Sequence, residues 1–308
     1  MKCYYCDEFV LPLPDGHRFP MEKYARLRHR VVAEGLAPAG SMEVPPAVSN
    51  EQLLLVHHAS YVRRVTTGTL EPDEVRRIGF PWTAALVERS RRSVGGTVAA
   101  CRAALQDGVA VNLAGGTHHA GADRGEGFCV FNDAAVAARV MQVEGHAYQV
   151  AIIDCDVHQG NGTAQIFAED RTVFTLSVHG ANNYPFHKAR SDRDVALPDG
   201  TGDREYLARL ARALDDLWEL GRIDLAVYVS GADPFVHDRL GRLALTRTGL
   251  AQRDVMVLGG LRERGIPVAV VMAGGYAPNV DDTVGIHLET VRAAARMVGP
   301  VRLASVSH

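Results

Sequence analysis

The sequence of 308 residues has no apolar run long enough to span a membrane and no tract of clustered basic residues. Its first eight residues also lack the apolar centre of a secretory signal peptide. The net charge of −3 is spread along the chain, so we expect neither a membrane partner nor direct nucleic-acid binding. The cytoplasm is therefore the expected location.

Cysteine is scarce and irregularly spaced. The five cysteines do not form the even, regular set of a disulfide framework. Cys3 and Cys6 make a CxxC without a second pair, which is weak evidence for zinc, so we expect reduced thiols with no catalytic role. We expect Cys129 and Cys155 to fill small apolar gaps rather than to act as nucleophiles.

Motifs for several common chemistries are also absent. No serine or cysteine lies in a nucleophile-elbow context, and no GxGxxG or P-loop pattern follows an apolar run. Hydrophobic residues make up 47% and charged residues 22% of the chain, as in ordinary globular proteins. No linker-like segment divides the sequence, so residues 1–308 are expected to form a single domain.

The hydrophobic periodicity predicts helices before residue 109 and alternating strands and helices after it. The early helical patterns cover 21–34 and 82–105, the second interrupted by the pair Gly95 and Gly96. Apolar runs predict strands over 109–113, 150–153, 173–178, 225–229 and 268–272. Helical patterns cover 132–143, 160–168, 206–220, 250–264 and 282–297. This alternation predicts an α/β fold whose mainly parallel sheet has helices on both faces.

Four of the predicted strands are followed by loops that contain glycine and chemically reactive side chains. These segments are 114–119, 154–158, 230–233 and 273–276. In parallel sheets ligands collect at the carboxyl ends of the strands, so we expect the four segments to meet at one edge. Strand alternation would also project Asp156 and His158 together where the second strand meets its loop.

The residue types in these loops indicate a metal site. Two carboxylates and one imidazole, from Asp156, His158 and Asp233, would hold a zinc-like ion with one position open. Such an ion acidifies a bound water molecule and polarises a carbonyl group. An isolated Asp-x-His pair is more often a solvated loop, but a third ligand after a separate strand favours the metal.

Two histidines and a tyrosine complete the predicted chemistry. His118 and His119 are adjacent and cannot easily chelate one ion together, so we expect them to transfer protons. Asp154 and Asn161 would support the two imidazoles, the carboxylate raising basicity and the amide only orienting its partner. Tyr276 could donate its hydroxyl to a developing oxyanion, the alternative being a packed core tyrosine. The simplest reaction class is amide hydrolysis.

These motifs, in this order, resemble the histone deacetylase family, which includes acetoin-utilisation proteins and acetylpolyamine amidohydrolases. The matching segments are GHRFPM (16–21), GGTHHA (115–120), GFCVFN (127–132), DCDVH (154–158), GAD (231–233) and GGY (274–276). DRG (123–125) and HQGNG (158–162) are most similar to the class IV branch and its bacterial relatives. The resemblance implies the arginase/deacetylase fold and one deacetylase-type catalytic domain.

The resemblance also implies residue roles. It implies one Zn²⁺ per chain held by Asp156, His158 and Asp233, with His118 and His119 as the proton-handling pair and Tyr276 as the oxyanion donor. Asp154 would pair with His118, and Asn161 stands where class I members have an aspartate beside the second histidine. A structural K⁺ is implied at Asp154, Asp156, His158, Ser177 and Val178. The residues expected to line an acyl-lysine tunnel are Gly127, Phe128 and Tyr184.

One further position bears on the substrate. Polyamine-selective members place an acidic gatekeeper after the third metal ligand, whereas Leu240 aligns with it here. This favours an acyl-lysine protein or peptide over an acetylpolyamine or another small amide. A catalytically silent acyl-lysine-binding protein is the alternative of another class, and the full set of motifs argues against it. An arginase-like enzyme would need a further acid where Gln159, Gly160 and Asn161 stand.

Overall fold

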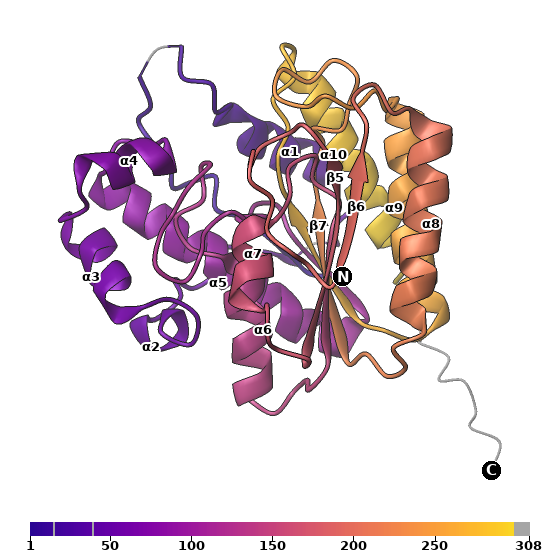
Figure 1. Cartoon of the computed structure of the whole chain (residues 1–308), viewed down its shortest axis with the longest axis horizontal. Coiled ribbons are helices and arrows are strands. Elements are labelled where there is room, and N and C mark those ends of the chain that lie inside the picture. The colour runs from indigo at the N-terminus through magenta and orange to yellow at the C-terminus, as the bar shows by residue number, and fades with distance from the viewer. Residues whose placement is uncertain (15, 39, 299–308) are drawn as a thin grey trace.

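An eight-stranded parallel sheet forms the centre of the molecule (Figure 1). The structure is a computed structural model and describes residues 1–14, 16–38 and 40–298. The strand order is β2-β1-β3-β8-β7-β4-β5-β6, and each neighbouring pair is parallel. The strands are β1 (Cys3–Tyr4), β2 (Met42–Glu43), β3 (Val109–Asn112), β4 (Val150–Asp154), β5 (Val173–Gly180), β6 (Arg193–Leu197), β7 (Leu225–Ser230) and β8 (Val268–Met272).

The central strands are buried on both faces, which explains their continuous apolar sequence. Every residue of β3, β4, β7 and β8 is buried. In β4, Ala151 and Ile153 pack into one core, while Val150 and Ile152 pack into the core on the opposite face. The predicted parallel sheet with helices on both faces is confirmed.

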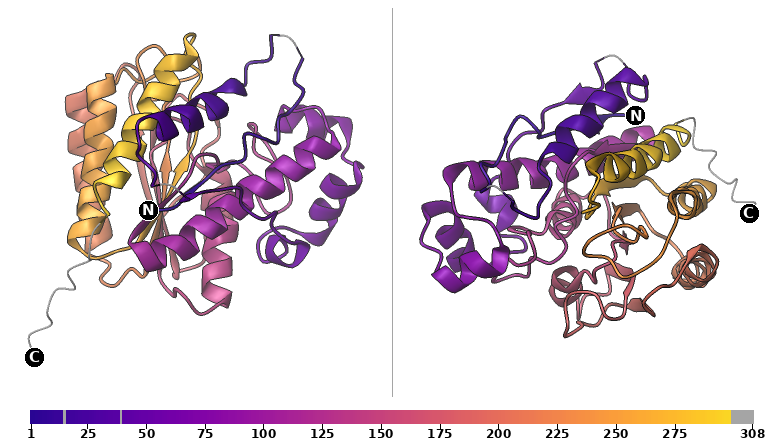
Figure 2. Two further views of the ribbon diagram at one scale, coloured as in Figure 1. Left: turned by 180° about the vertical axis from the view of Figure 1, so that it is seen from behind. Right: turned by 90° about the horizontal axis from the view of Figure 1, so that it is seen from above.

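Two helical layers cover the sheet. The helices are α1 (Glu22–Ala33), α2 (Asn50–Leu53), α3 (Ala59–Thr67), α4 (Pro72–Ile78), α5 (Ala84–Asp107), α6 (Asp133–Val143), α7 (Asn161–Ile166), α8 (Asp203–Trp218), α9 (Arg247–Glu263) and α10 (Val280–Ala295). Helices α1, α8, α9 and α10 contribute to one core, and α2 to α6 contribute to the other (Figures 1 and 2). Within the described ranges, none of the helices is both long and apolar enough to cross a membrane.

The structure corrects the prediction that Gly95 and Gly96 interrupt a helix. Helix α5 runs through both glycines without a break. A Cβ atom on Gly95 would collide with the carbonyl oxygen of Pro46, and one on Gly96 would lie 2.8 Å from the amide of Asn112. The glycines therefore let α5 pack closely against β3 and the segment before α2, rather than ending the helix.

Several short elements escaped prediction. They are the two-residue strands β1 and β2, the strand β6, and the helices α3 and α4. β1 and β2 are too short to show a periodic pattern, and β6 lies at the edge of the sheet with Ala196 exposed. The predicted strands and the later helices are present, with bounds that differ by a few residues.

Candidate active site

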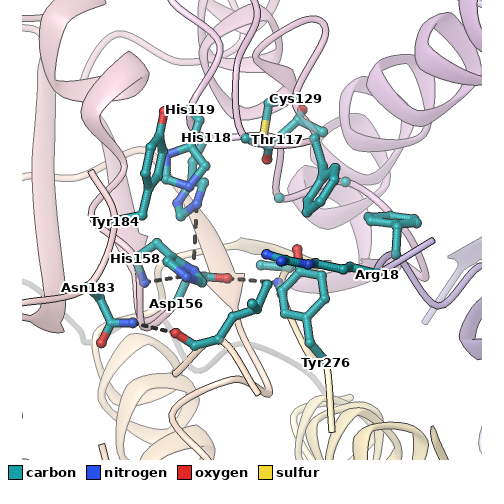
Figure 3. A pocket seen from close by; sticks show the side chains of 18 of the residues that line it. Arg18, Thr117, His118, His119, Cys129, Asp156, His158, Asn183, Tyr184 and Tyr276 are labelled. Carbon is teal, nitrogen blue, oxygen red and sulfur yellow. Dashed lines mark hydrogen bonds and ion pairs between the residues drawn. The ribbon is translucent and has the colours of Figure 1, made fainter. Parts of the chain in front are cut away.

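The four predicted segments meet at the carboxyl edge of the sheet. They follow β3, β8, β7 and β4, which are consecutive neighbours in the strand order. A cavity of about 400 Å³ opens at this edge (Figure 3). Its lining includes His118, His119, Asp156, His158 and Tyr276, all of them predicted from the sequence. The topology therefore brings residues more than 150 positions apart to one place.

Asp156, His158 and Asp233 form a buried cluster, here called the acid–histidine cluster. Each residue offers one ligand atom, and these atoms lie within 4.8 Å of one another. His158 Nδ1 is 2.9 Å from Asp156 Oδ1 and 3.3 Å from Asp233 Oδ2. β4 ends at Asp154 and β7 ends at Ser230, so all three cluster residues lie in the loops that follow the strands.

The cluster has the properties of a divalent-cation site. Asp233 Oδ2 is buried and makes no hydrogen bond to any residue in the described part of the chain. His158 Nδ1, 3.3 Å away, is too distant to hydrogen-bond it well, so a cation would satisfy this oxygen better. Two carboxylate oxygens and one imidazole nitrogen are also a donor set that suits Zn²⁺. The residues present therefore fit such an ion.

Backbone groups and glycines hold the two carboxylates in place. The N–H of Gly274 donates to Asp156 Oδ2 at 2.7 Å, and the N–H of Val157 donates to Asp233 Oδ1 at 3.0 Å. A Cβ atom on Gly231 would lie 2.6 Å from Asp233 Oδ1, and one on Gly274 would collide with the same carboxylate. Burial and the charge of Asp156 raise the pKa of Asp233 to about 7.

The two histidines have different partners. His118 Nδ1 lies 2.6 Å from Asp154 Oδ2, and His119 Nδ1 lies 2.7 Å from Asn161 Oδ1. Burial alone would lower the pKa of His118, but Asp154 and Asp156 raise it to about 9. Burial and the neighbouring imidazoles hold the pKa of His119 well below its usual range. The structure thus contains both pairings that the resemblance implies, and the two histidines differ in proton affinity.

The predicted tunnel residues also line the cavity. They are Gly127, Phe128, Tyr184 and Leu240. Tyr184 meets His119 edge-on with ring centroids 5.0 Å apart, and Phe128 faces Tyr276 with centroids 6.1 Å apart. Phe128 has a positive φ of 65°, a conformation uncommon for a residue with a side chain. The aromatic walls leave a passage that leads to the acid–histidine cluster (Figure 3).

The residues expected to bind K⁺ overlap the cluster, since Asp156 and His158 belong to both sets. Ser177 stands opposite Asp154 in the register of β4 and β5, and Val178 follows it. All five of these residues are buried. Asp154 Oδ1 accepts the N–H of Asp156 at 3.1 Å, which links this region to the acid–histidine cluster.

Sequence reasoning missed two charged groups beside Tyr276. The ammonium of Lys23 donates to the carbonyl of Ala273 at 3.0 Å and lies 5.5 Å from the ring centre of Tyr276. Asp238 Oδ2 accepts the N–H of Tyr276 at 2.6 Å. Burial lowers the pKa of Lys23 to about 8, although Asp233 and Asp156 oppose this shift. The only sequence signal for Lys23 is a charged residue on the apolar face of α1.

Two further residues that were missed support the loops from behind. Arg253 in α9 is fully buried and donates to the carbonyls of Gly231 at 2.6 Å and Cys155 at 3.2 Å. It therefore ties the loops after β4 and β7 to the same helix. Glu126 is buried and accepts a hydrogen bond from the amide of Asn161. It lies one residue before the recognised GFCVFN segment, so its position gave no separate signal.

The fold and this edge of the sheet define an α/β protein of the arginase/deacetylase type. The family model described as "Histone deacetylase domain" matches residues 17–291. The chain is 46% identical to an uncharacterised protein of Picosynechococcus sp., over 94% of this chain and 97% of that one. It is 32% identical to histone deacetylase 2 of Arabidopsis thaliana, over 84% of this chain and 70% of that one. The chain belongs to the histone deacetylase family.

Solved structures agree on the fold. A structure described as an HDAC homolog complexed with SAHA superposes with a TM-score of 0.84 and 23% identity, covering 97% of this chain and 85% of that one. The HD domain of HDA15 superposes with a TM-score of 0.80 and 22% identity, covering 96% and 88%. Membership of the family makes the chain a hydrolase that acts on amides.

Proposed function

We propose that this protein is a Zn²⁺-dependent amidohydrolase that removes acyl groups from Nε-acyl-lysine in a protein or peptide. The observation that carries the proposal is the buried acid–histidine cluster, two members of which, Asp156 and His158, line an aromatic cavity. In this cluster Asp233 Oδ2 accepts no hydrogen bond from the described residues and lies 3.3 Å from His158 Nδ1. A cation at this position would meet an amide carbonyl delivered along the cavity. The family supports amide hydrolysis in general, and the residues lining the cavity support the narrower assignment.

The metal ligands would be Asp156, His158 and Asp233, one ion per chain. Zn²⁺ bound there would polarise the scissile carbonyl and acidify the attacking water. The passage between Phe128 and Tyr184 would hold the extended acyl-lysine side chain with its carbonyl towards these ligands. An acyl-lysine side chain that filled the passage would exclude water from it, which would strengthen each electrostatic interaction at its inner end.

The histidines would manage the proton. Since Nδ1 of His119 faces the acceptor oxygen of Asn161, its proton lies there and Nε2 is free. We propose that Nε2 of His119 accepts a proton from the attacking water. The same imidazole then donates this proton to the leaving lysine amine. Nδ1 of His118 donates to the carboxylate of Asp154, which stabilises a positive charge on that ring beside the reacting carbonyl.

Tyr276 would stabilise the oxyanion. Its side chain lines the cavity, and its backbone N–H is fixed by Asp238. Burial raises the pKa of Tyr276 well above its usual range, so its hydroxyl stays a hydrogen-bond donor at neutral pH. We expect that hydroxyl to donate to the carbonyl oxygen as negative charge develops on it.

Finer predictions accompany this function. A structural K⁺ would be held by Asp154, Asp156, His158, Ser177 and Val178. The single-domain organisation and the cytoplasmic location stay predictions from the sequence. Leu240 lines the cavity where an acidic gate would favour polyamines, which supports the acyl-lysine substrate over an acetylpolyamine.

The test is a substrate panel with and without a chelator. An acetyl-lysine peptide, a long-chain acyl-lysine peptide and an acetylpolyamine would be compared by kcat/KM. We expect hydrolysis of an acyl-lysine peptide that chelation abolishes and Zn²⁺ restores. Activity that survives complete metal removal would contradict the mechanism, and a preference for the polyamine would contradict the substrate assignment.

A further inference from the structure

The entrance of the cavity is cationic. Arg18, Arg77 and Arg242 line it, and all three are exposed. Figure 3 shows the side chain of Arg18 extending into the pocket near Tyr276. Among the described residues that line the cavity, Asp156 is the only acid, and it belongs to the metal-ligand set. The entrance therefore presents positive charge to an incoming substrate.

Two of these arginines lie on segments that are fixed to the same wall. The backbone carbonyl of Arg77 accepts the N–H of Gly127 at 3.0 Å, so α4 is joined to the loop that carries Phe128. Next to Arg18, the ring of Phe19 lies 5.4 Å from that of Phe128. Arg18 and Arg77 are thus attached to a rigid aromatic wall, while Arg242 is joined to the Asn183 side chain near Tyr184.

These arginines are also available to a ligand. Arg76, the neighbour of Arg77, pairs with Asp73, but neither Arg18 nor Arg77 is ion-paired with a described residue. Arg242 Nη1 is 3.4 Å from Asp199 Oδ2, and both side chains are exposed, so this pair is weak. A guanidinium group binds a carboxylate with two parallel hydrogen bonds, which gives direction as well as charge.

We propose that the substrate carries a carboxylate close to the acylated amine, and that Arg18 and Arg77 bind it at the entrance. This inference rests on the proposed function, because it concerns the same cavity. The carboxylate can belong to an acidic residue beside an acyl-lysine or to the free α-carboxyl group of an N-acyl amino acid. A polycation would be repelled by the same arginines, in agreement with the apolar Leu240.

Binding and turnover test the proposal separately. Acetyl-lysine peptides of equal length with Glu, Gln or Lys flanks, and Nε-acetyl-lysine with a free or amidated α-carboxyl, would be measured for Kd and kcat/KM. We expect Glu flanks to bind about tenfold more tightly than Lys flanks, with a difference that shrinks as salt rises. A larger gain from the free α-carboxyl would identify the small substrate as the source.

Two variants assign the effect to these residues. Arg18→Gln and Arg77→Gln should each remove most of the preference for a carboxylate-bearing substrate. Both variants should raise Kd and KM for that substrate and change kcat much less. Arg76→Gln, on the same helix but already paired with Asp73, is the control and should leave the preference intact. Equal Kd values for Glu and Lys flanks, together with equal Kd values for the free and the amidated α-carboxyl, would overturn this proposal. Carboxylate-selective binding without hydrolysis of any substrate would overturn only the proposed function.

A second inference concerns the carboxylate behind His119 and rests on other contacts. The amide of Asn161 accepts from His119 Nδ1 and donates to Glu126 Oε1. Glu126 is 9% exposed, and its backbone exchanges hydrogen bonds of 3.0 Å and 2.9 Å with Cys129. His119, Asn161 and Glu126 therefore form a fixed chain from the cavity inwards.

Glu126 determines which way the amide of Asn161 faces. A carboxylate only accepts hydrogen bonds, so it holds the NH₂ group of Asn161 and leaves the amide oxygen towards His119. That oxygen requires the proton of His119 on Nδ1, which leaves Nε2 unprotonated on the cavity side. We propose that Glu126 is a positioning residue that holds His119 in the tautomer needed to accept a proton.

A swap of the two polar groups tests this role. Glu126→Gln frees both amides to turn, and Asn161→Asp places two carboxylates together. In the double variant, the carboxylate at position 161 accepts from the amide at position 126 and again accepts from His119 Nδ1. The bond between positions 126 and 161 is reversed, but the tautomer of His119 is restored. We expect kcat to fall about tenfold in each single variant with KM little changed, and to recover in the double variant.

A readout that does not depend on turnover accompanies the kinetics. Histidine ¹⁵N resonances should show Nδ1-protonated His119 in the native protein and a mixture of tautomers in Glu126→Gln. Glu144→Gln is the control for loss of a negative charge, because it removes a carboxylate that pairs with Arg102 and has no contact with His119 or Asn161. An unchanged tautomer in Glu126→Gln, or a double variant worse than both single variants, would overturn the proposal.

Discussion

The hydroxyl of Tyr276 makes no hydrogen bond to any other residue in the described ranges, although its backbone N–H is held by Asp238. A cavity-lining hydroxyl without a protein partner is free to donate to a ligand. The ring is meanwhile confined by Phe19 and Phe128, with centroids 6.4 Å and 6.1 Å away. Its position is therefore set by contacts that a substitution of the hydroxyl alone would leave intact.

Tyr276→Phe is accordingly a clean test of oxyanion stabilisation. We expect kcat to fall by about 10²–10³, corresponding to the loss of one preorganised donor, while the melting temperature and zinc content stay unchanged. Steady-state kinetics and metal analysis of the purified variant would measure this. Full activity in the variant would remove Tyr276 from the mechanism.

At the residue scale, the sequence revealed the site residues that lie close together in the chain. Asp156 and His158 are two residues apart, so a short motif is enough to reveal them. Lys23 contacts the carbonyl of a residue 250 positions away, and Glu126 contacts Asn161 over 35 positions. Such pairs have no local pattern, because their contact is created only when distant segments of the chain come together in the fold.

At the scale of elements, the apolar runs predicted every central strand because those strands are buried on both faces. The prediction that Gly95 and Gly96 interrupt a helix was wrong, because the sequence does not show which groups pack against a glycine. A glycine within a helical pattern can end the helix or admit a close neighbour, and only the packing distinguishes these cases. Neither Gly95 in α5 nor Gly259 in α9 ends its helix, and only Gly95 admits a close neighbour, since nothing lies within 4 Å of a Cβ added at Gly259.

The two glycines form a matched pair for a stability experiment. Gly95→Ala should destabilise the fold by about 2 kcal/mol or more, because α5 must move away from the carbonyl of Pro46. Gly259→Ala should stabilise it by about 0.5–1 kcal/mol, since alanine lowers the entropy cost of the helix without a clash. Urea unfolding of both variants would measure this, and equal effects would contradict the packing role of Gly95.

A buried histidine joins the outer helices to the active-site loop. His57, before α3, is 2% exposed. Its Nε2 accepts the N–H of Asn132 at 3.0 Å, and its Nδ1 donates to the carbonyl of Gly121 at 2.9 Å. Burial lowers its pKa from 6.5 to about 4, although the bond to Gly121 opposes the shift. The ring is therefore neutral in the folded state.

This arrangement predicts how acid acts on the protein. Between pH 6.5 and 4 the unfolded chain binds a proton at His57 that the folded chain does not, so the unfolding free energy falls as pH falls. The loss is about 3 kcal/mol across that window, and it vanishes well above pH 6.5, where His57 is neutral in both states. His57→Gln can keep both hydrogen bonds without titrating, so its stability should fall less steeply. Parallel slopes for the two proteins in urea unfolding would contradict this role.

At the scale of the whole molecule, the strand order determines which loops can cooperate. The neighbours β3, β8, β7 and β4 come from distant parts of the chain, yet their carboxyl ends bring the histidine pair, Tyr276, Asp233 and Asp156 together. The order itself was not predictable, because periodicity identifies strands without saying which of them pair. Because Asp156 and Asp233 are buried beside each other, the repulsion between their carboxylates lowers the stability of the folded chain.

That repulsion would link a bound metal ion to the stability of the entire fold. If the proposed assignment is right, Zn²⁺ would bind the folded cluster far better than the unfolded chain, so a thousandfold excess over Kd should stabilise the protein by about 4 kcal/mol. We expect Zn²⁺ added after chelation to raise Tm by about 5–10 °C in differential scanning calorimetry. Asp233→Asn should abolish the rise, because an amide cannot provide the missing anionic ligand, whereas Glu263→Gln, at an exposed carboxylate, should retain it. An equal rise in Asp233→Asn would place the stabilising ion outside the acid–histidine cluster.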